Sequence, residues 1–267
     1  MEKIGLIAGN RKFPLKLCEE ARKKGCYIVA VAIKKDTSRR INKLADKVYW
    51  LGLEDFSRLF DIFKNEGITK VAMAGQISPW RLFSDEVNKD EKLKALLQRI
   101  KDQKADTIFA AVAQMLEMSG FHMISSLTYL DKLIPQKGVL TKCEPNFAGW
   151  DDIYFGFDLA KEIAYLDIGQ TVAIKNKAVV AVEALEGTDK LIRRAGRITK
   201  GDFTLVKVSK PEQDFRFDVP VVGLNTVKNL INSKAKCLAI EAGKTLFIDK
   251  EQSIELADRK GLIIVSL

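Results

Sequence analysis

Short apolar segments alternate with longer amphipathic segments over the first half of the chain. The apolar segments predict strands over 3–8, 27–33, 47–51, 70–74 and 121–125. The segments between them predict helices over 13–24, 54–66, 89–101 and 106–119. This βαβ rhythm indicates a doubly wound, mostly parallel sheet. We therefore predict an α/β protein with a Rossmann-like N-terminal domain over residues 1–131.

The second half of the chain has a different pattern. A turn-rich stretch at 133–138 precedes it, and we place the domain boundary there. Helices are predicted over 146–166, 188–195, 225–231 and 252–260, and strands over 171–175, 178–183, 203–208, 236–241, 245–249 and 262–265. Residues 138–267 should therefore form a distinct mixed α/β C-terminal domain.

Local signals in the second half predict its connections. Asn176-Lys177 lies between two apolar segments and predicts a two-residue hairpin turn. Residues 242–244 predict a second hairpin between the segments 236–241 and 245–249. Thr188 or Asp189 is expected to cap the helix that begins there.

Composition narrows the class of protein. The chain has 267 residues, of which 47% are apolar and 30% are charged. No apolar run approaches the roughly 20 residues that span a bilayer, and the start MEKIGLIAGN does not have the pattern of a secretory signal. The four cysteines are scattered, without paired metal spacing, and we expect reduced thiols in a cytosolic protein.

The charge and the scarcity of histidine restrict the chemistry. His122, expected to be a packed structural residue, is the only histidine, so acid–base work falls to carboxylates, lysines or metal-bound water. The net charge is +9, and residues 1–130 hold 23 basic and 16 acidic side chains. An anionic small molecule or an anionic membrane surface fits this excess. The basic residues lack interleaved aromatics, so no nucleic-acid partner is expected.

Two predicted strand ends in the first domain carry glycine. Gly9-Asn10 and Gly75-Gln76 follow the segments 3–8 and 70–74. In a doubly wound sheet, ligands bind beyond the carboxyl ends of the strands, and a helix N-terminus near Gly9 could hold a phosphate. Ordinary turn glycines would give the same pattern. The stretch GLIAGN is not G-x-G-x-x-G, which counts against a nicotinamide-dependent oxidoreductase.

The stretch VKVSKPEQDFRFDVP, residues 206–220, concentrates candidate chemistry. Asp214, Arg216 and Asp218 alternate with Phe215 and Phe217. If this piece is extended, the two carboxylates and the guanidinium share one face. Such a face suits a divalent metal together with a phosphate. A solvated strand face with a surface salt bridge is the alternative.

The predicted second domain is rich in groups that bind metals and phosphates. Carboxylates, arginines and lysines of this kind occur at Glu183, Glu186, Asp189, Arg193, Arg194, Lys207, Lys210, Asp214, Arg216, Asp218 and Glu241. A bound cation makes water a better nucleophile and shields an attacked phosphorus. This composition points to hydrolysis or transfer at a phosphate ester or anhydride.

Five motifs together resemble a known family. They are GLIAGNRKFP (5–14), GVLTKCEP with a following tryptophan (138–150), EALEGTDKLIRRAG (183–196), LVKVSKPEQDFRFDVP (205–220) and AIEAGKTLFIDKE (239–251). In combination they are similar to the LpxI-type UDP-2,3-diacylglucosamine pyrophosphatases of lipid A synthesis. The resemblance runs nearly end to end. It implies a hydrolase in which water attacks the α-phosphorus of UDP-2,3-diacylglucosamine, giving UMP and 2,3-diacylglucosamine 1-phosphate (lipid X).

The resemblance also implies a cofactor and site residues. Mg²⁺ or another divalent cation is expected. The catalytic aspartate should lie in the motif 213–218, with Asp218 favoured over Asp214, and Asp214, Asp218 and Glu186 are the expected metal ligands. Substrate-binding residues are expected at Gly9, Asn10, Gly75, Gln76, Thr188, Asp189, Arg193, Lys207, Lys210 and Arg216.

The implied substrate is amphiphilic, which sets expectations for location. We expect a cytoplasmic protein, peripheral to the inner membrane, that holds the acyl chains in an apolar cleft. Candidate walls, each of which could equally be a packing residue, are Phe147, Trp150, Tyr154, Phe155 and the stretch 80–83. A homodimer is expected as the commonest closed assembly. The alternative function is a non-catalytic module that binds a nucleotide or an acyl ligand.

Overall fold

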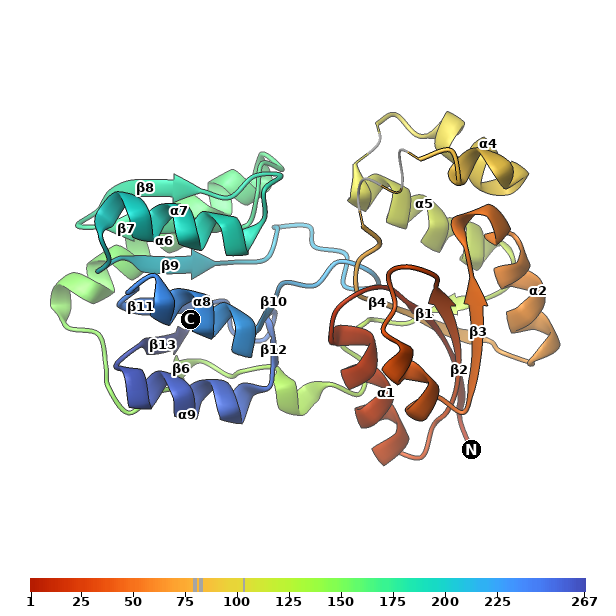
Figure 1. Ribbon diagram of the computed structural model, residues 1–267, viewed down its shortest axis with the longest axis horizontal. Helices are drawn as coiled ribbons and strands as arrows, with labels where there is room; N and C mark the ends of the chain where they lie inside the picture. The colour runs from red at the N-terminus through yellow and green to blue at the C-terminus, as the bar shows by residue number, and fades with distance from the viewer. Residues whose placement is uncertain (79–80, 82–83, 103) are drawn as a thin grey trace. The chain divides into compact units, whose positions relative to one another are not determined.

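Contacts divide the chain into two compact units. The structure, a computed structural model, describes residues 1–78, 81, 84–102 and 104–267. The first unit comprises Met1–Asp131 with Asp214–Asp218, and the second comprises Lys132–Gln213 with Val219–Leu267. Each unit has its own sheet covered by helices (Figure 1). The predicted fold class, α/β in both halves with a Rossmann-like first part, is confirmed.

The first unit is built on a five-stranded parallel sheet in the order β3-β2-β1-β4-β5. The strands are β1 (Lys3–Ala8), β2 (Tyr27–Ile33), β3 (Lys47–Leu51), β4 (Lys70–Ala74) and β5 (His122–Met123). The helices are α1 (Phe13–Lys23), α2 (Arg58–Asn65), α4 (Glu91–Arg99) and α5 (Ala105–Met118). This order is that of a doubly wound sheet.

Apolar residues from strands and helices form the core of the first unit. Val29 of β2 and Val71 of β4 share one buried cluster with Phe63 of α2 and Leu116 of α5. β2 is buried along almost its whole length, as expected of a parallel strand covered on both faces. The single histidine, His122, lies exposed in β5, so its predicted role as a packed residue is wrong.

Strand order reverses between β1 and β4, and two glycines allow the chain to pass there. The Gly9 N–H donates to the Ala74 carbonyl at 2.8 Å, and the Asn10 N–H donates to the Gln76 carbonyl at 2.7 Å. A Cβ on Gly9 would lie 2.6 Å from the Gln76 oxygen. Gly75 has a φ of +80°, and a Cβ on it would lie 2.5 Å from the Asn10 oxygen. Only glycine permits this close backbone approach.

The second unit has a six-stranded mixed sheet in the order β6-β13-β11-β9-β7-β8 and a parallel pair, β10-β12. The strands are β6 (Gly138–Val139), β7 (Thr171–Lys175), β8 (Ala178–Val182), β9 (Thr204–Lys207), β10 (Val221–Gly223), β11 (Cys237–Ile240), β12 (Leu246–Ile248) and β13 (Ile263–Ser266). The helices are α6 (Phe147–Tyr165), α7 (Thr188–Thr199), α8 (Leu224–Asn232) and α9 (Lys250–Lys260).

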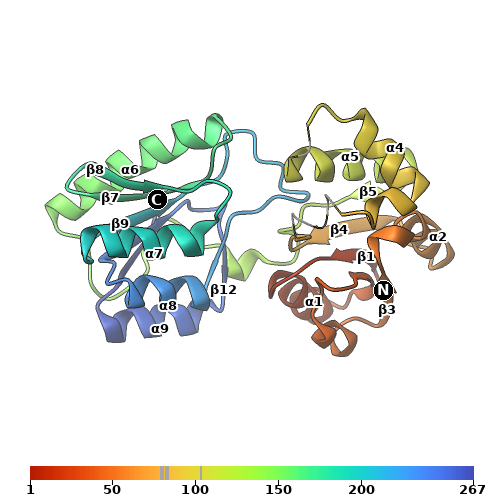
Figure 2. The ribbon, with the colours of Figure 1, turned by 45° about the horizontal axis from the view of Figure 1, so that its top comes forward.

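Helices cover both faces of this sheet. α7, α8 and α9 lie side by side on one face, and α6 lies on the other (Figure 2). Two separate buried clusters mark the faces, one containing Leu191, Leu230 and Ala257 and the other containing Ile153 and Ala160. Among the described residues, no helix has the length and apolar character needed to cross a membrane.

One predicted hairpin is confirmed and the other is wrong. β7 and β8 pair antiparallel about Asn176 and Lys177, both with positive φ, as a primed turn requires. β11 instead pairs in parallel with β9 and β13, and β12 pairs in parallel with β10. An apolar strand carries no local mark of its partner, so the neighbours along the chain were mistaken for neighbours in the sheet.

Residues 214–218 form a turn and do not have the extended conformation under which Asp214, Arg216 and Asp218 would share one face. The N–H groups of Phe217 and Asp218 donate to the Asp214 carbonyl at 3.2 and 2.9 Å, which closes a turn. The Asp214 Oδ1 accepts from the Arg216 N–H at 3.0 Å. Aspartate side chains commonly bond the backbone two residues on in this way, and that preference overrode the period-two pattern.

Helix caps follow the sequence in one case and not in another. The side chain of Asn146 caps α6 by accepting from the Gly149 N–H at 2.9 Å. The predicted cap of α7 by Thr188 or Asp189 is wrong, because the N-cap residue is Gly187, which makes no side-chain cap bond. Thr188 instead donates its hydroxyl to Glu183 at 2.7 Å.

The strand reversal gives a matched test of the fold. Gly75 and Gly25 have nearly the same φ, +80° and +81°, but a Cβ on Gly25 meets no atom within 4 Å. Gly25→Ala should cost about 1 kcal/mol of unfolding free energy, from its left-handed backbone alone. Gly75→Ala should cost at least about 2 kcal/mol more, because of the clash with the Asn10 oxygen. Urea unfolding of both variants would measure this, and equal losses would contradict the close approach.

Candidate functional site

The turn 214–218 places two carboxylates and one guanidinium on the first unit. It comes from the second half of the sequence, but its contacts are with the first unit. Phe217 packs against the core of that unit, with its ring centroid 6.4 Å from that of Phe109. The Phe215 carbonyl accepts from the Ser126 N–H, just beyond β5. The turn therefore lies at the carboxyl edge of the parallel sheet, where doubly wound folds bind ligands.

Ion pairing fixes the charges of this turn. Both oxygens of Asp214 accept from the Arg216 guanidinium, at 2.7 to 3.1 Å. The same guanidinium donates to Glu117 of α5 at 2.8 Å. Arg216 therefore holds the pKa of Asp214 below its ordinary value, so that this carboxylate is ionised at neutral pH. Glu117 was not predicted, because no local signal links α5 to a turn about a hundred residues later in the chain.

The glycine-bearing strand ends lie at the same edge. Gly9-Asn10 and Gly75-Gln76 are joined by the backbone bonds described above. The Asn10 Oδ1 is buried and has no hydrogen-bond partner among the described residues. A buried acceptor of this kind is available for a donor on a ligand. The predicted substrate-binding role of these four residues stays a prediction.

A buried charge network lies beyond β2. Arg81 is 1% exposed and donates to the Lys34 carbonyl, to Asp36 and to Glu86 at 2.5 to 2.6 Å. Asp36 also accepts from Ser78. A dinucleotide-binding sheet needs a free carboxylate near this strand end for a ribose, and here Arg81 occupies that carboxylate. Arg81 is thus buried in an ionic network, while Trp80, Leu82 and Phe83, predicted as cleft walls with it, lie outside the described residues.

At the carboxyl edge of the second unit's sheet, a lysine is buried with polar partners. Lys207 ends β9 and is 8% exposed. Its ammonium donates to Thr188 at 3.0 Å and to Thr171 at 3.3 Å, and it lies 3.8 Å from Glu183. The Glu183 Oε2 has no hydrogen-bond partner within the described residues. The structure thus brings together Thr188 and Lys207, which were predicted separately.

A second buried network lies at the same edge. Glu241 accepts from Lys161 of α6 at 2.6 Å, and from both the N–H and the hydroxyl of Ser209 at 2.8 Å. Lys244 pairs with its other oxygen at 2.9 Å. Burial opposes the ionisation of Glu241, but the donors together outweigh it and lower the pKa to about 2. Lys161 was not predicted, because it lies outside the charged motifs, and Ser209 was not predicted, because it is an uncharged residue within the stretch 206–220.

The remaining predicted residues of the second unit have structural partners. Lys210 pairs with Asp167. Asp189 accepts from Asn229 of α8 at 2.8 Å, and its carbonyl accepts from the exposed Arg193 at 3.2 Å. These contacts show how the side chains are oriented. The predicted substrate-binding roles of Asp189, Arg193 and Lys210 stay predictions.

Glu186 was predicted as a metal ligand and has two donors. It accepts from Arg194 at 2.5 Å and from the Ala184 N–H at 3.1 Å. Its pKa is lowered by backbone hydrogen bonds and by Arg194. Its role toward a metal stays a prediction.

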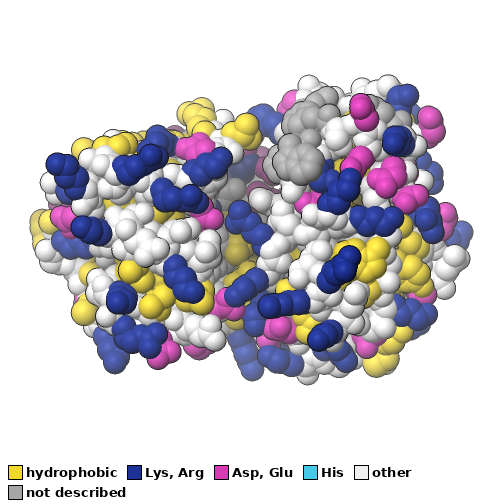
Figure 3. Space-filling model, viewed as in Figure 1, with side chains coloured by type: hydrophobic (Ala, Val, Ile, Leu, Met, Phe, Trp, Pro, Cys, Tyr) yellow, Lys and Arg dark blue, Asp and Glu magenta, His cyan; other side chains and the backbone are white. Residues whose placement is uncertain are grey.

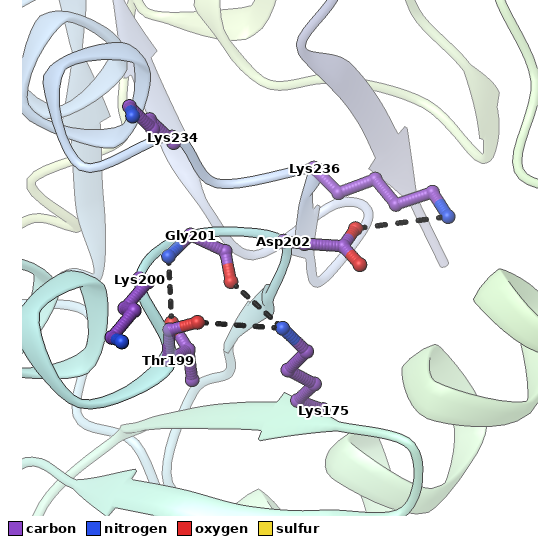
Figure 4. Close-up of a pocket in the computed structure, with 7 residues that line it drawn as sticks. All are labelled: Lys175, Thr199, Lys200, Gly201, Asp202, Lys234 and Lys236. Atoms are coloured by element: carbon purple, nitrogen blue, oxygen red, sulfur yellow. Dashed lines mark hydrogen bonds and ion pairs between the residues drawn. The ribbon is translucent and has the colours of Figure 1, made fainter.

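Two depressions on the second unit are lined by basic residues. One, of about 370 Å³, lies along α7 and is lined by Glu186, Lys190, Arg193, Arg194 and Arg197. The other, of about 430 Å³, is lined by Lys175, Thr199, Lys200, Gly201, Asp202, Lys234 and Lys236 (Figure 4). In the second, Lys175 donates to the carbonyls of Thr199 and Gly201 where α7 ends. It lies at the amino ends of β9 and β11, away from Lys207 and Glu241.

Basic side chains are not confined to these depressions. Lys and Arg are spread over the visible face of each unit, with Asp and Glu among them (Figure 3). On this face the basic side chains are therefore spread out rather than gathered in one patch (Figure 3). Such a surface gives a general attraction for anions, and it does not by itself locate the site.

The described residues place a limit on metal binding. They contain no group of three or more His, Cys, Asp or Glu side chains arranged to hold a metal ion. Mg²⁺ is usually bound by one or two carboxylates, with water and substrate phosphate oxygens as the other ligands. Asp214 and Asp218, which share one turn, are the carboxylates predicted for a site of that open kind, and both oxygens of Asp214 also accept from Arg216. The described residues do not form a site in which protein side chains alone would surround the ion.

The lowered pKa of Glu241 allows the contribution of its hydrogen bonds to the stability of the protein to be tested. Because the folded-state pKa lies below the ordinary value, its stabilising effect is present above about pH 4.5 and is lost as the pH falls toward 2. Glu241→Gln should lower the unfolding free energy by about 2 kcal/mol at pH 7, and the deficit should shrink by pH 2.5. Urea unfolding at several pH values measures this. The exposed Glu212→Gln control should change it by less than about 0.5 kcal/mol, and a deficit that does not depend on pH would contradict the assignment.

Comparison with known proteins gives a consistent result along the chain. Residues 3–133 match the family model of the LpxI N-terminal domain, and residues 136–265 match that of the LpxI C-terminal domain. A curated relative, UDP-2,3-diacylglucosamine pyrophosphatase LpxI of Caulobacter vibrioides, is 29% identical over 279 residues. That match covers 100% of this chain and 98% of the relative.

Solved structures give weaker likenesses. The biotin carboxylase domain of Hydrogenobacter thermophilus 2-oxoglutarate carboxylase matches with a TM-score of 0.28 and 16% identity, over 67% of this chain and 36% of that chain. Phosphoribosylglycinamide synthetase of Anaerococcus prevotii matches with a TM-score of 0.25 and 10% identity, over 76% of this chain and 44% of that chain. At these TM-scores, neither structure informs the function of this chain. The two family models together match nearly the whole sequence, and the chain belongs to the LpxI family.

Proposed function

We propose that this protein is a metal-dependent hydrolase that cleaves the pyrophosphate bond of UDP-2,3-diacylglucosamine. Water attacks the α-phosphorus, giving UMP and 2,3-diacylglucosamine 1-phosphate (lipid X), in lipid A synthesis. The activity for which the Caulobacter vibrioides relative is named supports the substrate, because that protein aligns with the whole of this chain. The presence of both family domains supports the same reaction.

The structural observation that carries the proposal is the turn 214–218 at the carboxyl edge of the first unit's sheet. It supplies Asp214, Arg216 and Asp218 in a segment that packs near the ends of β4 and β5. Asp214 is committed to Arg216 through both of its oxygens. Asp218, which the family-like Val219-Pro220 follows, is favoured as the catalytic carboxylate, and Asp214 is the alternative. An ionised Asp218 would orient the attacking water and accept its proton.

Mg²⁺ or another divalent cation is the cofactor we propose. Asp214 and Asp218 would hold it, and the diphosphate would complete its coordination. When bound, the ion supplies positive charge that stabilises the charge developing on the phosphate oxygens. Glu186 remains a further proposed ligand.

We propose that the enzyme works at the cytoplasmic surface of the inner membrane, as a peripheral homodimer. The net charge of +9 suits an anionic surface and a diphosphate substrate. Phe147 and Tyr154 of α6 are 84% and 57% exposed, and Phe155 is 37% exposed. Trp150 stacks on Tyr154 with ring centroids 5.6 Å apart. This aromatic surface supports contact between α6 and acyl chains.

The reaction is tested by product analysis in ¹⁸O-labelled water, using UDP-2,3-diacylglucosamine with Mg²⁺ or with a chelator. We expect cleavage with Mg²⁺, its loss with the chelator, and label in UMP, because water adds to the α-phosphorus. Label in lipid X would keep the hydrolase but contradict the site of attack.

The same experiment separates the alternative function. Binding of UDP-2,3-diacylglucosamine without cleavage under any divalent metal would contradict the enzyme assignment. It would identify a non-catalytic module that binds a nucleotide or an acyl ligand. Cleavage that continues at full rate with the chelator would contradict the metal requirement alone.

A further inference from the structure

Two adjacent serines follow β5, and the sequence pattern assigns neither a function. Ser125 is the last residue of the predicted strand 121–125, Ser126 follows it, and both come after the end of β5 at Met123. β5 pairs in parallel with β4, so both serines lie at the carboxyl edge of the first unit's sheet. The turn 214–218 packs at this edge.

Ser126 contacts the turn through its backbone and its side chain. Its N–H donates to the Phe215 carbonyl at 2.7 Å. Its hydroxyl lies 2.8 Å from the Arg216 carbonyl and in hydrogen-bond contact with the Met73 carbonyl of β4. The residue is fully buried. Because a hydroxyl has one proton to donate, two carbonyl oxygens share it, and this sharing joins the turn to β4.

Ser125 contacts the same turn less closely. Its hydroxyl lies 3.4 Å from the Phe215 carbonyl and accepts from the Leu127 N–H at 3.2 Å. The side chain is only partly buried. Ser125 is therefore a matched control. Replacing it by alanine also removes a serine hydroxyl, but the Met73 and Arg216 carbonyls keep their donor, which is Ser126.

The contacts of Ser126 determine where the aspartates lie. Asp214 and Asp218 are the two ends of the turn, and the Asp218 N–H donates to the Asp214 carbonyl at 2.9 Å. Phe215 and Arg216, the two residues whose carbonyls Ser126 contacts, lie between them. The Glu117–Arg216 ion pair and the packing of Phe217 against the core hold the side chains of the turn, whereas Ser126 holds its backbone.

We propose that Ser126 is a positioning residue for hydrolysis. Its N–H and hydroxyl fix the backbone of the turn at the carboxyl end of β4, and so they fix the carboxylates of Asp214 and Asp218 relative to the strand ends. The inference rests on the proposed pyrophosphatase function and assigns Ser126 a role in it that is exerted through the turn 214–218. Small displacements of catalytic groups cost large factors in rate.

The test compares steady-state hydrolysis of UDP-2,3-diacylglucosamine by full-length variants. Ser126→Ala should lower kcat by about 10- to 100-fold, with KM changed by less than about threefold, because the carboxylates shift while most binding contacts remain. Ser125→Ala should stay within about twofold of the parent in both constants. Thermal unfolding establishes that each variant is folded at the assay temperature. If Ser126→Ala is unfolded there, Ser126→Cys, which keeps a weak donor in a similar volume, replaces it, with a smaller loss of kcat expected.

A double-mutant cycle separates positioning from general stability. In an Asp218→Asn background, Ser126→Ala should change the residual rate by less than about twofold, because the group that it positions has already lost its charge. A full, additive loss in that background would overturn the proposal, as would a kcat of Ser126→Ala equal to that of the parent. If the parent itself does not cleave the substrate, the proposed function fails and the inference fails with it. A parent that cleaves while Ser126→Ala matches it overturns the inference alone.

Discussion

The hydrogen bonds between Ser126 and the backbone of residues 215 and 216 are the constraint on which the candidate site depends. They tie a segment from the second half of the sequence to the sheet of the first unit. The chain leaves the second unit after Gln213 and returns to it at Val219. With Phe217 packed against the first unit's core, the turn is held by both its backbone and a side chain. The turn that carries these carboxylates therefore lies at the carboxyl edge of the parallel sheet.

Buried and half-buried charges in both units are balanced by specific partners. In the first unit, Arg216 joins Asp214 to Glu117, and Arg81 joins Asp36 to Glu86. In the second unit, Glu241 accepts hydrogen bonds from Lys161 and Ser209 and pairs with Lys244, at the ends of β9 and β11. Removing one partner of such a pair would leave an uncompensated buried charge and would lower the stability of the fold. These networks therefore hold the loops at the carboxyl edges in defined positions.

The sequence could predict the features that local chemistry determines. The βαβ rhythm of the first half and the Asn176-Lys177 turn follow from periodicity and backbone preference, and both are confirmed. The glycines at 9 and 75 were correctly recognised as strand ends, although their close approach depends on two strands that are distant in sequence. The pairing of β11 and β12 could not be predicted, because parallel partners are selected by the whole sheet.

The candidate site shows the same division. Its aspartates could be found from residue type and from the family resemblance, but their conformation could not. Alternation of Asp214, Arg216 and Asp218 imitates a strand, whereas the bond from the Arg216 N–H to Asp214 forms a turn. Ser126, Glu117 and Lys161 were missed, because each acts on residues about fifty to a hundred positions away, and only the folded chain brings them together.

The most direct measurement of the central claim is amide hydrogen exchange on the full-length protein, resolved at Ser126 and at the β4 residues. The Ser126 N–H is expected to be protected to the same degree as the amides of β4, because it donates to the Phe215 carbonyl in a buried contact. Exchange at Ser126 as fast as in exposed loops, with β4 still protected, would contradict the account. It would show that the turn 214–218 is not held on the sheet, where the proposed function needs its carboxylates.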